Sequence, residues 1–108
     1  MQKTYTSVLA RRVRIDGDFT TLPYEAGWAN EAVFFIQTEA QHPKLEVAVE
    51  VSPDGINWIR RGNPVDMGVD DAIAEIPVTK FGNWLRVTVR GSTPEADSRI
   101  LIHVNLKG

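Results

Sequence analysis

The residue types suited to acid–base or nucleophilic chemistry are few and scattered in this sequence. Histidine occurs at two positions, His42 and His103, which lie far apart in the chain. Cysteine is absent, which excludes disulfides, thiolate metal sites and a cysteine nucleophile. No serine stands in a nucleophile-elbow motif such as G-x-S-x-G. We therefore predict that the protein is not an enzyme and that it uses no cofactor, with His42 a loop residue and His103 an exposed or interface residue.

The acidic residues gather at one place, where Asp66, Asp70 and Asp71 occur within six positions. A flexible loop of carboxylates can supply oxygen ligands for calcium. The spacing does not fit an EF-hand loop, which requires further acidic or amide positions, a glycine and a distal glutamate. We favour a solvated acidic loop here and predict no metal site.

The aromatic residues are better candidates for binding. Trp84 is followed two residues later by Arg86, and Trp and Arg are enriched in the hot spots of protein interfaces. Exposed aromatic rings also stack on sugars, so Tyr24, Trp28 and Trp84 form a candidate glycan-binding set. The alternative is that Trp28 and Trp58 cap the open ends of a hydrophobic core. We favour the core for Trp58, because large aromatic side chains dominate small β cores.

The stretch 44–61, KLEVAVEVSPDGINWIRR, is the clearest structural signal. Apolar and polar residues alternate from Leu45 to Ser52, as in a strand with one buried and one solvated face. The turn sequence SPDG follows at 52–55, where proline presets φ, aspartate bonds its own backbone and glycine accepts positive φ. A second β-rich run returns from Ile56 to Arg61, so the stretch predicts a β-hairpin.

The remaining chain reads as short strands separated by turn signals, with no helical period. We expect strands at 4–15, 19–22, 32–39, 73–78, 84–90 and 98–106. The run 32–39 is nearly continuously apolar, which predicts a buried strand. Pro77 places the strand at 73–78 at a sheet edge or a strand end. Together these predict one domain over residues 1–108, an antiparallel β-sandwich or jelly roll of about seven to eight strands.

Charge and hydropathy exclude several partners. The net charge of −2 gives no electrostatic basis for binding nucleic acid or an anionic membrane. The first residues contain no apolar run of the length that a signal peptide needs, and no segment approaches the roughly 20 apolar residues of a membrane span. We expect a soluble protein without a signal peptide.

The last two long strands offer a docking face if they pair as a hairpin. The outward residues of 84–90 would then lie beside those of 98–106 and form a broad, cationic, partly apolar surface. An ordinary solvated sheet face is the alternative reading. The predicted interface residues are Trp84, Arg86, Arg90, Arg99, Leu101 and His103.

Two segments carry a resemblance to known proteins. VEVSPDGINW at 49–58 and NWLRVTVRG at 83–91 resemble strands in β-sandwich modules of bacteriophage virion proteins, both capsid-decorating and tail-associated. A weaker similarity is to discoidin-type (coagulation factor 5/8 C-terminal) domains. The resemblance implies a non-enzymatic structural or decorating module that binds copies of itself and a larger protein shell, in the cytoplasm or in a virion. A carbohydrate-binding β-sandwich module is the alternative function.

Overall fold

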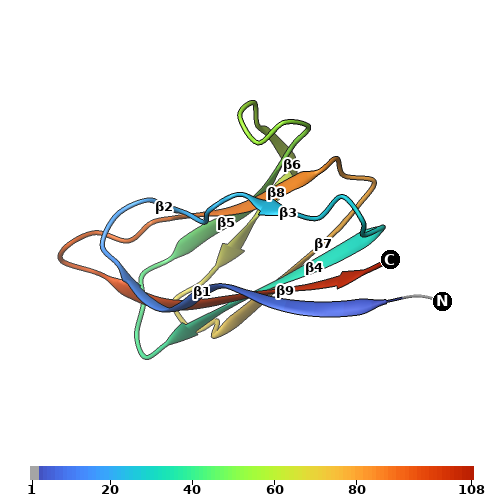
Figure 1. The fold of residues 1–108 in the computed structure, drawn as a ribbon. Coiled ribbons are helices and arrows are strands. Elements are labelled where there is room, and N and C mark those ends of the chain that lie inside the picture. Colours follow the sequence, from blue (N-terminus) through green and yellow to red (C-terminus); the bar gives the residue numbers. More distant parts are fainter. Residues whose placement is uncertain (1–2) are drawn as a thin grey trace.

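The computed structural model describes residues 3–108, which form two antiparallel β-sheets packed face to face (Figure 1). The strands are β1 (Thr4–Ile15), β2 (Phe19–Thr20), β3 (Tyr24–Glu25), β4 (Glu31–Glu39), β5 (Leu45–Ser52), β6 (Ile59–Met67), β7 (Ile73–Thr79), β8 (Trp84–Arg90) and β9 (Ser98–Lys107). Sheet A has the order β1-β9-β4-β7. Sheet B has the order β2-β8-β5-β6, with β3 also paired to β8. The predicted all-β sandwich is confirmed, and nine strands form because the two-residue strands β2 and β3 both pair with β8.

The core lies between the sheets and is built by the alternation of side chains along each strand. In β9 every second residue, from Ile100 to Leu106, is fully buried, and Leu85, Val87 and Val89 do the same in β8. The core cluster contains aliphatic residues with Phe34 among its largest members, and no tryptophan of residues 3–108 belongs to it. The expectation that Trp58 caps the core is therefore wrong.

Strands β8 and β9 belong to different sheets. β8 pairs with β5, whereas β9 pairs with β1 and β4. The connection begins at Gly91, whose φ is +123° and where a Cβ atom would collide with the carbonyl oxygen of Lys44. The predicted β8–β9 hairpin is therefore wrong. Both strands carry an apolar face, and these faces meet across the core instead of side by side.

The β5–β6 hairpin is present, and β6 continues to Met67, beyond the predicted run of Ile56 to Arg61. β4 differs from its prediction in how many of its side chains are buried. Ala32, Phe34 and Ile36 are buried, but Val33 and Phe35 lie on the outer face of sheet A and are only half-buried. The expectation of a wholly buried strand is therefore wrong for every second residue of β4.

Two features stand out in the outline of the sandwich. The loop that joins β5 to β6 projects from sheet B, and the start of β1 and the end of β9 lie beside each other at one end of sheet A (Figure 1). The backbone ladder between β1 and β9 reaches these ends through paired hydrogen bonds between Lys3 and Gly108. Within residues 3–108 no helix is long and apolar enough to cross a membrane.

Candidate functional site

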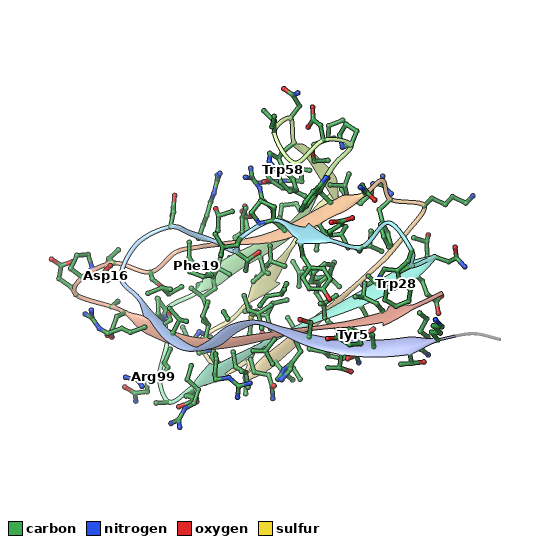
Figure 2. All side chains as sticks on the ribbon, viewed as in Figure 1. Tyr5, Asp16, Phe19, Trp28, Trp58 and Arg99 are labelled. Carbon is green, nitrogen blue, oxygen red and sulfur yellow. The ribbon has the colours of Figure 1, made fainter. Side chains whose placement is uncertain are left out.

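The predicted interface residues lie on the two opposite outer faces of the sandwich. Those on sheet B are Trp84, Arg86 and Arg90 of β8, and those on sheet A are Arg99, Leu101 and His103 of β9. Trp58 lies beside the upper layer and Arg99 below the lower one in Figure 2. A single continuous face made by all six residues is therefore excluded, because the whole core separates its two halves.

The outer face of sheet B is a ladder of paired charges. Glu50 lies in register between Arg60 on β6 and Arg86 on β8. The Arg86 Nε atom donates a hydrogen bond of 2.6 Å to Glu50 Oε1, and the two side chains are 27% and 18% exposed. The guanidinium also lies 4.2 Å from the centroid of the Trp58 ring, within the range of a cation–π contact. Trp58 thus rests on Arg86 at the surface.

The projecting hairpin loop is held by one carboxylate. Asp54 accepts hydrogen bonds from the backbone amides of Asn57 (2.9 Å) and Ile56 (2.8 Å) and from Asn57 Nδ2 (2.8 Å). These donors hold the pKa of Asp54 well below its usual range. The Trp84 ring packs beneath Gly55, which has φ +79°. The result is a braced loop whose Ile56 side chain is 78% exposed.

The outer face of sheet A carries a patch of apolar side chains, which we call the sheet A patch. Its members are Val8, Val33, Phe35, Ile73, Pro77 and Leu101. His103 lies in register between Val8 and Phe35 at the centre of the patch. Ile73 at its border is 54% exposed, and Leu101 and Phe35 are half-buried. Within residues 3–108 no strand or loop forms a layer over this face.

Charges of opposite sign flank the sheet A patch at both ends. On β9 the cations Lys107 and Arg99 stand at the two ends, and on β4 Glu31 and Glu39 stand directly beside them. Glu39 also accepts a 2.7 Å hydrogen bond from Arg12 Nε, which raises the pKa of that guanidinium. β9 is thus the cationic column of the face, and β4 is the anionic column.

The three aromatic residues proposed for glycan binding do not share a surface. Tyr24 packs against the core, and Trp84 lies on the outer face of sheet B. Trp28 is 47% exposed and lines an open hollow of about 660 Å³ together with Tyr5 and Gly108. The three rings therefore cannot form one stacking platform, and this part of the alternative function is wrong.

The remaining sequence candidates have structural contacts. Asp71 accepts a 2.8 Å hydrogen bond from the Gly68 amide. No group of three or more His, Cys, Asp or Glu residues within 3–108 could hold a metal ion. His42 is buried rather than a plain loop residue, with Nδ1 2.7 Å from the carbonyl oxygen of Pro43 and Nε2 2.7 Å from that of Asp71. It joins the β4–β5 connection to the β6–β7 loop.

The residues that sequence reasoning missed are Val33 and Phe35. A strand with one buried face alternates apolar and polar residues, whereas AVFFI at 32–36 is apolar at every position. In an antiparallel sheet such a run indicates that both faces carry apolar side chains. The signal was present, but it was assigned to burial within the chain.

The fold and its surfaces define a small antiparallel β-sandwich module. Residues 28–108, three quarters of the chain, match the family described as Domain of unknown function (DUF6385), and the chain belongs to this family. A comparison with curated protein sequences found no match.

Solved structures of other proteins share the fold at low sequence identity. The PBSX exported protein XepA matches with a TM-score of 0.73 and 11% identity over 94% of this chain and 36% of its own. The SPBc2 prophage-derived protein YomS matches with a TM-score of 0.68 and 8% identity over 100% and 96%. The infectious bursal disease virus VP2 subviral particle matches with a TM-score of 0.61 and 9% identity over 98% and 32%. This chain thus spans about a third of the XepA chain, and the expected resemblance to phage β-sandwich proteins is confirmed at the level of fold.

Proposed function

We propose that this protein is a non-enzymatic structural module of a larger protein assembly, located in a virion or in the cytoplasm, and that it binds through its outer sheet faces. The observation that carries the proposal is the sheet A patch, where His103 lies in register with Phe35, with Val33 in one flanking row and Leu101 in the other. Contiguous apolar surface on a small domain is typical of a protein interaction site. The fold shared with two phage-derived proteins and a subviral particle supports the same class of function.

The proposal gives the two faces separate roles. Arg99, Leu101 and His103 belong to the contact between copies of this chain. Trp84 and Arg86 brace the projecting hairpin from below, and we assign to that hairpin the contact with the larger shell. Arg90, at the far end of β8, completes this second surface.

Light scattering over a wide concentration range tests the proposal. The chain mass is 12.1 kDa, and we expect the measured mass to rise to a defined multiple of it as concentration increases. The same samples unfold in one transition if residues 1–108 form one domain, as we propose. A mass that stays at 12.1 kDa at the highest concentration would contradict self-assembly.

A further inference from the structure

We propose that the outer face of sheet A binds a second copy of this chain across a two-fold axis that runs parallel to the strands, between β9 and β4. This rests on the proposed function and adds the partner, the face and the orientation. Three observations carry it: the apolar centre of the face, its size, and the placement of its charges.

The apolar centre provides the driving force. The rows Asn105–Val33–Pro77 and Leu101–Gln37–Ile73 flank the row Val8–His103–Phe35–Glu75, so apolar side chains lie in three successive rows, with the charged Glu75 at the β7 edge of the central one. Two such faces pack about 10 Å apart with aligned strands in β-sandwiches. A second copy would bury the apolar members of these rows, although the outer face is more polar than the inner face that packs against sheet B.

The size of the face fits a small to standard interface. Four strands about 4.8 Å apart and nine residues rising about 3.4 Å each give a flat footprint of about 600 Å². Specific complexes bury about 800 Å² of accessible surface per partner, and a side-chain surface exceeds its flat footprint. We therefore expect a dimer whose population depends on concentration.

The charges determine the orientation. A two-fold axis parallel to the strands keeps each row at its own height and exchanges the columns, so β9 of one copy faces β4 of the other. Lys107 then faces Glu31 of the second copy, and Arg99 faces Glu39, at both ends of the interface. At the centre, His103 lies over Phe35 of the second copy. An axis perpendicular to the strands would instead place each column over itself and lose this complementarity.

Charge exchange at Lys107 and Glu31 gives a test that separates contacts between chains from contacts within a chain. Glu31→Lys makes both positions cationic, and Lys107→Glu makes both anionic, so each variant repels its own copy. A mixture of the two variants restores opposite charges at the two contacts between positions 31 and 107, and the two contacts between Arg99 and Glu39 are unchanged. We expect each variant alone to dissociate with a Kd raised about tenfold at low salt, and the mixture to return to the wild-type Kd. Within each chain of the mixture, the cross-strand neighbours 31 and 107 still carry like charges, so only a contact between chains can be rescued.

Phe35→Glu tests the apolar centre, with Ile56→Glu on the projecting hairpin as the matched control. Phe35→Glu should remain monomeric at concentrations where the wild type and Ile56→Glu are dimeric, with circular dichroism confirming that all three are folded. A wild-type oligomer that neither Phe35→Glu nor the charge variants weaken would overturn this interface but leave the proposed function standing. A wild type that remains monomeric would overturn both.

Discussion

The two outer faces of the sandwich differ in the contacts that their side chains make within the chain. On sheet B, Arg86 is bound by Glu50 on one side and covered by Trp58 on the other. On sheet A, Phe35 and Leu101 lie half-buried on the outer face, with charges at the ends of the strands and Glu75 beside Phe35. Both exposed-face tryptophans of sheet B are therefore engaged within the chain, Trp58 by Arg86 and Trp84 by Gly55.

This difference shows that residue type alone does not identify a docking face. Trp and Arg are enriched in binding hot spots because they combine a large apolar surface with hydrogen-bonding groups. The same properties let them brace a surface within one chain, as Trp84 does beneath Gly55. A face can be judged only from whether contacts within the chain already engage the rings and hydrogen-bonding groups of its side chains.

The largest effect is expected from Phe34→Ala, compared with Phe35→Ala on the same strand. Phe34 is fully buried, so its truncation should lower the free energy of unfolding by about 3–5 kcal/mol. Phe35 points to the outer face of sheet A, so its truncation should cost about 1 kcal/mol or less in the monomer. Urea denaturation at low protein concentration measures both. Equal losses would show that the two faces of sheet A are equally buried within one chain.

On sheet B, removing one member of the Glu50–Arg86 pair should have an intermediate effect. Arg86→Ala leaves the Glu50 carboxylate, only 18% exposed, without its 2.6 Å hydrogen bond, and should cost about 1–3 kcal/mol. Trp58 fluorescence should change as well, because its cation–π partner is lost.

The double variant Glu50→Ala/Arg86→Ala is the matched control for that loss. It removes both charges and should recover part of the stability, since no buried charge then lacks a partner. Dimerisation should be unchanged in both variants. Dissociation of the dimer by Arg86→Ala would move the interface to sheet B and reverse the comparison between the two faces.

Gly55→Ala should have a smaller effect at the hairpin loop. Gly55 has φ +79°, and an added methyl group would lie 3.4 Å from the Trp84 ring. An L-residue in this conformation costs roughly 1 kcal/mol, and the contact adds little if the indole shifts slightly. Gly17→Ala, at a position with open space around it, is the control. Equal melting temperatures for the two variants would show that the loop conformation at Gly55 is not required.

Local chemistry made much of this fold predictable. The SPDG turn specified the β5–β6 hairpin because Asp54 accepts hydrogen bonds from the amides of Ile56 and Asn57 and Gly55 takes positive φ, all within residues 54–57. Pro77 likewise marked β7 as an edge strand, which it is in sheet A. These features depend on neighbours in sequence, so the sequence suffices to predict them.

Sheet membership and the exposed patch were not predictable in this way. Leu85 and Ile100 would be equally buried whether their strands paired in one sheet or faced each other across the core, so alternation does not distinguish the two arrangements. Phe35 resembled a core residue in the sequence. An apolar residue type does not indicate whether its side chain is buried by its own chain or by a second chain. On the outer face of sheet A, the sequence prediction named Leu101 and His103 but not Val33 and Phe35.

The smallest expected effect is the pH dependence of the stabilisation that Asp54 gives to the projecting hairpin. The folded-state pKa of Asp54 is depressed below the ordinary value of about 3.9, chiefly by hydrogen bonds from the backbone amides of Asn57 and Ile56. A depressed carboxylate contributes its full stabilisation above the unfolded-state pKa and loses it as pH falls below that value. The carboxylate is fully solvent-accessible, so we expect a fall of only a few degrees in Tm from this group.

Melting curves of the wild type and Asp54→Asn at pH 7 and pH 3 isolate this contribution. Asparagine accepts some of the same hydrogen bonds but carries no charge, so the two proteins should differ at pH 7, and the difference should be smaller at pH 3. The Kd of the proposed sheet A dimer should change equally with pH in both proteins, because Asp54 lies on the hairpin of the other sheet. If the wild-type dimer dissociates in acid and the Asp54→Asn dimer does not, the hairpin belongs to the interface. Both outer faces would then contribute to the same interface.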